Sequence, residues 1–168
     1  MTMREDAPMI QVTDATSQEG LHHARRLFRS YVAEFAGSFA EAHCLRDLEG
    51  EIAGLPGRYA PPSGCRLLAI DGDCPAGCVA LRDLGGGACE MRRLYVAPES
   101  RGRGIGRALV EAVLHRAWRA GYRRMVLDTL PEMVEAVALY RSSGFVETSP
   151  YWGCPVERTI YLERFLTG

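Results

Sequence analysis

A glycine-rich turn between a strand and a helix constrains this chain more than any other feature. Its residues, Arg101-Gly102-Arg103-Gly104-Ile105-Gly106, follow an apolar strand that ends near Val96 and open an apolar-periodic helix. Glycines at alternate positions let the backbone turn tightly and approach a ligand closely. The helix behind them presents unpaired N–H groups and the positive end of its dipole. The turn therefore predicts a cradle for a pyrophosphate.

The residues around the turn decide which kind of phosphate loop it is. The dinucleotide fingerprint needs a glycine three residues after Gly104, where this chain has Arg107. The Walker pattern needs Gly-Lys, but all 20 basic residues are arginine. The same lack of lysine excludes Schiff-base chemistry. The pattern that fits is Arg-x-x-Gly-x-Gly at Arg101, Gly104 and Gly106, with Arg103 and Arg107 adding positive charge.

This pattern resembles the pyrophosphate loop of the GNAT superfamily of acyl-CoA-dependent N-acyltransferases. Arg93-Leu94-Tyr95-Val96, just before the loop, is similar to the strand that holds the pantetheine arm by main-chain bonds in that family. Leu139-Tyr140 followed by Gly144-Phe145 resembles its Leu-Tyr-x-x-x-Gly-Phe stretch. The resemblance is dense over residues 88–145 and thinner over residues 10–84. It is closest to the small bacterial members with Arg-Leu-Tyr-Val before the loop.

The resemblance implies acetyl-CoA as the cosubstrate and no metal. The residues implied to bind it are Leu94, Tyr95, Val96, Arg101, Gly102, Arg103, Gly104, Ile105, Gly106 and Arg107. The chain departs from the family pattern after the fifth strand. Many relatives carry there an asparagine that touches the cofactor, whereas this chain has Asp128-Thr129.

Glu90 is the candidate general base, because an ammonium must lose a proton before it can act as a nucleophile. Strand alternation is expected to put Glu90, Arg92, Leu94 and Val96 on one face. In the histone-acetylating branch of the family a general-base glutamate occupies the matching position. The alternative interpretation is an exposed strand glutamate paired with Arg92 or Arg93.

Tyr140 is the candidate general acid, because the matching tyrosine of the family reaches the thioester sulfur. A phenol with a pKa of about 10 can share a proton with a thiolate without losing it to water at pH 7. The alternative is a core tyrosine in a helical stripe with Ala136 and Leu139. A backbone N–H near Leu94 or Val96 would polarise the thioester carbonyl. Cys89 faces away from Glu90, so a route through an acetyl-cysteine ranks below direct attack.

Hydrophobic periodicity and turn residues predict the element order β-α-α-β-β-β-α-β-α-β-β. This is the order of the GNAT fold, an α/β (α+β) class with a mixed, mostly antiparallel central sheet flanked by helices. We expect a single domain over residues 1–168. The expected strands cover residues 10–12, 65–70, 78–81, 89–96, 124–128, 145–147 and 157–162, and the expected helices cover residues 16–37, 40–53, 104–120 and 132–142.

Composition excludes several classes of partner. The net charge is −1 and the pI about 6.4, so no global charge attracts nucleic acid or an anionic membrane. The first nine residues are polar and do not form a secretory signal, so we expect a cytoplasmic protein. The 6 cysteines form no C-x-x-C pair and show no metal-ligand spacing with histidine, which favours small core residues over a zinc site.

The sequence thus predicts an N-acetyltransferase that moves the acetyl group of acetyl-CoA to a primary amine of a small molecule or peptide, by direct attack in a ternary complex. In this fold residues 31–59 and Tyr151-Trp152-Gly153 would wall the acceptor pocket. Small amines, amino acids, antibiotics and protein N-termini all remain open as acceptors, and a homodimer is compatible with the sequence. One rival is a non-catalytic acyl-CoA-binding sensor, which would need neither Glu90 nor Tyr140. Another is a nucleotide-binding regulator.

Overall fold

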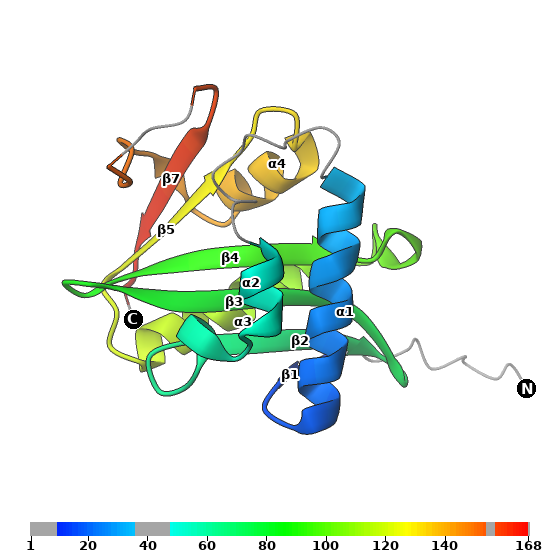
Figure 1. Cartoon of the computed structure of the whole chain (residues 1–168). Coiled ribbons are helices and arrows are strands. Elements are labelled where there is room, and N and C mark those ends of the chain that lie inside the picture. The colour runs from blue at the N-terminus through cyan, green and yellow to red at the C-terminus, as the bar shows by residue number, and fades with distance from the viewer. Residues whose placement is uncertain (1–9, 36–47, 154–156, 168) are drawn as a thin grey trace, which may run out of the picture.

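One twisted sheet organises the molecule. The computed structural model describes residues 10–35, 48–153 and 157–167. Within them the strand order is β1-β2-β3-β4-β5-β7-β6, and among these strands only β4 and β5 pair in parallel (Figure 1). This confirms the expected mixed, mostly antiparallel sheet. The strands are β1 (Ile10–Asp14), β2 (Cys65–Asp71), β3 (Cys74–Gly85), β4 (Ala88–Val96), β5 (Arg124–Thr129), β6 (Val146–Glu147) and β7 (Ile160–Phe165).

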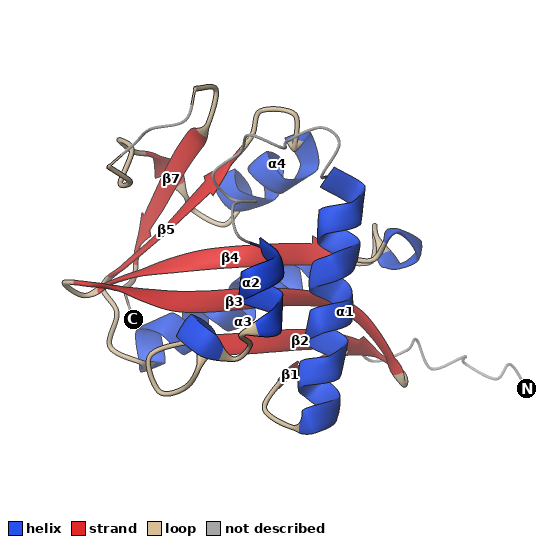
Figure 2. Ribbon diagram, in the orientation of Figure 1, coloured by secondary structure: helices blue, strands red, loops and turns tan. Residues whose placement is uncertain are grey.

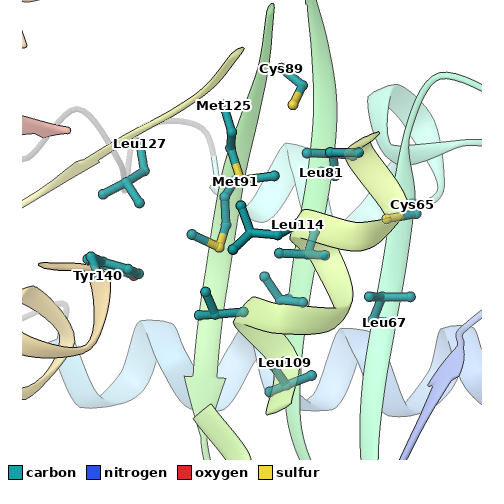
Figure 3. Packing of buried hydrophobic residues seen from close by; sticks show 14 of the residues in the cluster. Cys65, Leu67, Leu81, Cys89, Met91, Leu109, Leu114, Met125, Leu127 and Tyr140 are labelled. Atoms are coloured by element: carbon teal, nitrogen blue, oxygen red, sulfur yellow. The ribbon is translucent and has the colours of Figure 1, made fainter. Parts of the chain in front are cut away.

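Helices cover both faces of the sheet (Figure 2). On one face α3 (Ile105–Arg119) packs Leu109 and Leu114 against Leu81 and Met91, as Figure 3 shows. On the other face α1 (Gln18–Phe35) and α2 (Leu48–Ala53) bury a second apolar cluster that includes Phe28. The fourth helix, α4 (Val134–Ser142), follows β5. The described residues also include the short 3₁₀ turns η2 (Gly57–Tyr59) and η3 (Pro98–Ser100).

The element boundaries follow the sequence prediction to within a few residues in most places. The helix expected over residues 104–120 is α3, and the helix expected over residues 132–142 begins at Val134. The strand expected over residues 78–81 is longer, and the last strand lies three residues later than expected. Residues 40–47 of the expected second helix, and Gly37, lie outside the described residues.

A β-bulge in β4 overturns one expectation about the site. Arg93 has a φ of 58°, in the left-handed region that non-glycine residues rarely adopt. The β3–β4 register shifts there, because Cys78 pairs with Tyr95 while Ala80 pairs with Arg92. Val79 of β3 thus stands opposite two residues of β4, Arg93 and Leu94, and beyond them the side chains of β4 point to the opposite faces from those that simple alternation predicts.

The bulge separates residues that were expected to share a face. Leu94 and Val96 pack against the α3-side core, whereas Tyr95 belongs to the core under α1 and α2. Glu90 and Arg92 lie with the second group, in a polar network beside α2. The prediction that Glu90, Arg92, Leu94 and Val96 share one face is therefore wrong beyond Arg92.

The parallel strands β4 and β5 diverge along their length. Ladder pairing between them is confined to Ala88–Glu90 and Arg124–Val126. Beyond these residues β4 runs toward η3 and β5 toward α4, as Figure 1 shows. The second half of β4 therefore has no β5 partner in the described structure, and its main chain borders the gap between the strands.

Candidate active site

The glycine loop before α3 has the backbone that its sequence predicts. Gly102 and Gly104 have φ values of 75° and 78°, and Gly104 is the N-cap of α3. A side chain there would be strained even though the space is open. Gly106 serves packing instead, because an added Cβ would lie 3.1 Å from Leu139 Cδ2 of α4. The loop therefore brings the N-terminus of a 15-residue helix to the surface without side chains in front of it.

A cleft of about 480 Å³ lies between this loop, the diverging end of β4 and the start of α4. It is lined by eight of the ten residues expected to bind the cosubstrate, which are Leu94, Tyr95, Val96, Arg101, Gly102, Gly104, Ile105 and Gly106. Sequence reasoning missed the walls that come from α1 and from the start of α4, among them Glu34 and Met133. No local motif marks those walls, because the sheet brings them to the cleft.

The three arginines of the loop are engaged within the protein. Arg101 reaches both carboxylate oxygens of Glu34 at 2.8 Å and donates from Nε to the carbonyl oxygen of Val96 at 3.0 Å. Arg103 forms an ion pair with Asp71 at the end of β2. Both ion pairs are partly exposed, so each contributes little to the free energy of folding. Either arginine can therefore exchange its carboxylate partner for a more highly charged anion.

Arg103 and Arg107 do not line the cleft formed by the described residues. Arg107 lies on the first turn of α3 and donates from Nη2 to Ser142 Oγ at 3.0 Å. Of the three expected phosphate-binding arginines, the structure brings Arg101 alone to the cleft wall. The other two lie beside the loop, where they contribute positive charge at longer range.

A smaller inner cleft adjoins the main one. It has a volume of about 30 Å³ and shares Leu94 and Met133 with the main cleft. Its other lining residues are Tyr31, Met91, Arg92, Arg93, Leu127, Asp128, Thr129 and Tyr140. The inner cleft is therefore far more polar than a core cavity, and it adjoins the main cleft at Leu94 and Met133.

Tyr140 is both a core residue and a residue of the inner cleft. It is buried in the α3-side core, where its ring packs edge-on against Phe145 at a centroid distance of 6.0 Å. It also lines the inner cleft. The Leu-Tyr-x-x-x-Gly-Phe spacing thus places the tyrosine and the phenylalanine side by side, and leaves the tyrosine on the wall of the cleft.

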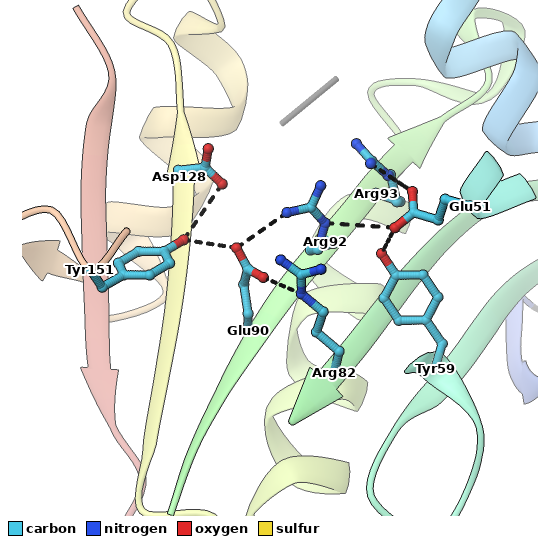
Figure 4. A network of polar contacts seen from close by, with 8 residues as sticks. All are labelled: Glu51, Tyr59, Arg82, Glu90, Arg92, Arg93, Asp128 and Tyr151. Carbon is cyan, nitrogen blue, oxygen red and sulfur yellow. Dashed lines mark hydrogen bonds and ion pairs between the residues drawn. The ribbon is translucent and has the colours of Figure 1, made fainter. Parts of the chain in front are cut away.

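Glu90 is enclosed rather than exposed. Its side chain has 0% exposure, and Arg82 Nε donates to Oε2 at 2.5 Å. Arg92 Nη1 lies 3.4 Å from Oε1, and the Tyr151 hydroxyl donates to the same oxygen at 3.0 Å (Figure 4). The pairing with Arg92 that the alternative interpretation proposed is present, but the exposure that it assumed is not. Glu90 lines neither of the two clefts formed by the described residues.

The polar network continues from Glu90 toward α2. Glu51 Oε2 lies 2.6 Å from Arg93 Nη2, and the Tyr59 hydroxyl donates to Glu51 (Figure 4). Arg92 lies between Glu90 and Glu51. Burial disfavours its charge, but the neighbouring acidic groups outweigh burial and raise the pKa of Arg92 above its ordinary value. Arg92 therefore stays charged at any pH relevant to the protein.

Tyr151 joins this network to β5. Burial, together with the charges of Asp128 and Glu90, raises the pKa of the Tyr151 phenol far above its ordinary value. It is thus a neutral hydroxyl with one proton to donate, and Asp128 Oδ1 lies 3.5 Å from its oxygen. Trp152, the other expected pocket aromatic, lies 5.0 Å from the Arg82 guanidinium. The sequence signal for the Arg82–Glu90 contact is the Gly85-Gly86-Gly87 turn, since the hairpin around it pairs these residues directly.

Cys89 lies on the α3 side of the sheet, as strand alternation predicts. Burial raises the pKa of its thiol to about 12, so the thiol is protonated at neutral pH. A thiolate is the nucleophilic form of cysteine. This position therefore does not support an acetyl-cysteine route.

Two further features are absent from the described residues. No helix within the described ranges is long and apolar enough to cross a bilayer. In the same part of the chain, no group of three or more histidine, cysteine, aspartate or glutamate side chains is placed to hold a metal ion.

Comparisons with known proteins point in one direction. Residues 21–145 match the model of the acetyltransferase (GNAT) family. An uncharacterized N-acetyltransferase of Schizosaccharomyces pombe is 41% identical over 137 residues, which are 80% of this chain and 84% of that protein. The IAA acetyltransferase of Azospirillum brasilense is 34% identical over 113 residues, which are 67% of this chain and 69% of that protein.

A solved structure extends the comparison to the fold. The PaiA N-acetyltransferase of Thermoplasma acidophilum, in complex with coenzyme A, superposes with a TM-score of 0.71 at 18% identity. The match covers 94% of this chain and 99% of that one.

Proposed function

Because the chain belongs to the acetyltransferase (GNAT) family, we propose that it moves the acetyl group of acetyl-CoA to a primary amine of a small molecule or peptide. The amine attacks directly while both substrates are bound. One observation carries the proposal: the cleft at the glycine cradle adjoins a polar inner cleft with a tyrosine, and the two clefts share Leu94 and Met133. The Arg93-Leu94-Tyr95-Val96 stretch supports a place among the small bacterial members.

The main cleft offers acetyl-CoA two features, the N-terminus of α3 and a stretch of β4 that has no β5 partner among the described residues. The pyrophosphate is proposed to lie on the N–H groups of the loop from Gly102 to Gly106, at the positive end of the α3 dipole. The pantetheine arm then runs along Leu94, Tyr95 and Val96, where β4 has no β5 partner among the described residues. This places the thioester near Leu94 and Met133, the two residues that the clefts share.

The acetyl transfer needs one bond made and one broken. The amine nitrogen forms a bond to the thioester carbonyl carbon, and the carbon–sulfur bond breaks. A backbone N–H near Leu94 stabilises the oxygen of the tetrahedral intermediate. Tyr140 gives its proton to the departing sulfur. The products are the N-acetylated amine and CoA thiol.

Glu90 has a supporting part in this proposal. Its carboxylate is enclosed by Arg82, Arg92 and Tyr151, so an amine in the inner cleft cannot contact it directly. Tyr151 lines neither cleft formed by the described residues, whereas Arg92 lines the inner one. We therefore propose Glu90 as a positioning carboxylate that holds Arg92, which borders the proposed acceptor site, and Tyr151, which contacts Asp128 of the same cleft.

The test is release of CoA thiol from acetyl-CoA in the presence of separate classes of amine: small amines, amino acids, aminated antibiotics and peptides with a free N-terminus. We expect amine-dependent release with at least one class. Tight acetyl-CoA binding without amine-dependent release from any class would favour the non-catalytic sensor instead.

A further inference from the structure

We propose that Asp128 is the group that receives the acceptor amine, binding it as an ammonium and taking its first proton. The inference rests on the proposed acetyl transfer and specifies which side chain contacts the acceptor. Asp128 lies near the end of β5, where the sheet has already separated from β4. It is half-buried and lines the inner cleft together with Tyr140.

The position of Asp128 suits an ammonium better than that of Glu90. Glu90 accepts from Arg82 at 2.5 Å and from Tyr151 at 3.0 Å and is fully buried. Tyr151 has a single proton, and its oxygen lies 3.5 Å from Asp128, too far for a strong O–H···O bond. Asp128 lines the inner cleft and Glu90 does not, so an amine in that cleft meets the Asp128 carboxylate and not that of Glu90.

The charged and titratable groups around Asp128 come from three elements. On β4, Glu90 and Arg92 face Asp128, and the guanidinium of Arg92 interacts electrostatically with the Asp128 carboxylate. From the segment before β7, Tyr151 reaches it, and Tyr161 of β7 is its register partner. Arg92 is bonded to Glu90 and near Glu51, so its charge is shared among three carboxylates. A cationic amine in the inner cleft therefore meets a carboxylate on the β5 wall beside the tyrosine that serves the sulfur.

The proton balance of the reaction requires a proton acceptor, and Asp128 is the carboxylate that lines the inner cleft among the described residues. An ammonium loses two protons when it becomes an amide nitrogen. The first goes to Asp128 and on to solvent, which frees the lone pair that attacks the thioester carbon. The second replaces, through water, the proton that Tyr140 gives to the sulfur. The net result is one N-acetylated amine, one CoA thiol and one proton released.

The experiment compares Asp128→Asn with wild type on two acceptors of similar shape: an alkylamine that is almost fully protonated at the assay pH, and an analogue of low pKa that is almost fully neutral. We expect kcat/KM for the alkylamine to fall by a factor on the order of 10² to 10⁴. The loss with the neutral analogue should be much smaller, because that acceptor arrives without its first proton. The Kd for acetyl-CoA should stay within about twofold, since Asp128 does not line the main cleft.

Controls separate this role from a structural one. Asp14→Asn removes a partly exposed carboxylate, paired with Arg116, from the edge strand β1 and should leave both activities unchanged. Asp128→Glu keeps a carboxylate and should recover part of the alkylamine activity. Equal losses on both acceptors, or full activity of Asp128→Asn, would overturn the inference while leaving acetyl transfer intact. A wild-type protein that acetylates neither acceptor nor any other amine would sink the proposed function itself.

Discussion

At the scale of single residues, Tyr140 carries the most direct prediction. Tyr140→Phe keeps the ring that packs on Phe145 and removes the proposed proton donor. Turnover should fall by a factor on the order of 10², with acetyl-CoA affinity nearly unchanged. The rising limb of the pH–rate profile should stay in place while its plateau drops.

Tyr122→Phe is the matched control for that variant. Tyr122 is also a buried tyrosine, but its hydroxyl donates to the carbonyl oxygen of Ser63 at 2.6 Å, outside both clefts. Removing this hydroxyl should lower the free energy of unfolding by about 1 kcal/mol and leave the turnover rate unchanged. Equal turnover losses in the two phenylalanine variants would show that Tyr140 acts through packing alone.

Glu90 leads to a prediction about stability. Glu90→Gln keeps the shape but leaves Arg82 and Arg92 without the charge that now balances them in a buried site. Breaking a buried ion pair by removing one partner typically costs about 3–5 kcal/mol. Chemical denaturation should therefore show a large loss. Glu163→Gln, which removes the partly exposed partner of Arg124, should show a smaller one. A Glu90→Gln protein as stable as wild type would mean that the network is not held by this carboxylate.

At the scale of elements, the loop before α3 can be tested by one substitution. Gly104→Asp places a negative charge where the pyrophosphate is proposed to sit, and forces a side chain onto a φ of 78°. Acetyl-CoA binding should be lost in a protein that remains folded. Gly121→Asp is the matched control, because Gly121 follows the other end of α3 with a φ of 90° and open space around it. Unchanged affinity of folded Gly104→Asp would place the cradle elsewhere.

The same elements show what a sequence can and cannot specify. The loop, the α3 boundaries and the pairing of Tyr140 with Phe145 were predictable, because each depends on residues close together in the chain. The bulge at Arg93 was not, because it follows from the register between β3 and β4 and carries no glycine to mark it. As a result, alternation placed Leu94 and Val96 on the face of Glu90, where they do not lie.

The polar network was beyond sequence reasoning for a similar reason. Tyr151 reaches Glu90 across 61 positions of the chain, and Arg93 reaches Glu51 across 42. No spacing rule connects such residues. Burial of Glu90 is a property of the assembled sheet and the segment before β7, so neither the general-base prediction nor the alternative of an exposed strand glutamate anticipated it.

At the scale of the whole molecule, ligand binding should raise stability by mass action. A ligand that binds the native state alone adds about 2.7 kcal/mol when its concentration is a hundredfold above its Kd. Acetyl-CoA should therefore raise the melting temperature in a concentration-dependent way. NADH serves as the comparison ligand, since the loop lacks the dinucleotide fingerprint. A response to NADH with none to acetyl-CoA would contradict the proposed use of the main cleft.

The central claim, direct acetyl transfer from acetyl-CoA to an amine, is tested most directly by following a labelled acetyl group. The protein is first incubated with acetyl-CoA that carries an isotopic label in its acetyl group, and an accepted amine is added afterwards. The masses of the intact protein and of the amine are measured by mass spectrometry at each stage. The account predicts no labelled acetyl group on the protein at either stage, and label on the amine nitrogen only after the amine is added. Label on the protein before the amine arrives, or no label on any amine, would contradict it.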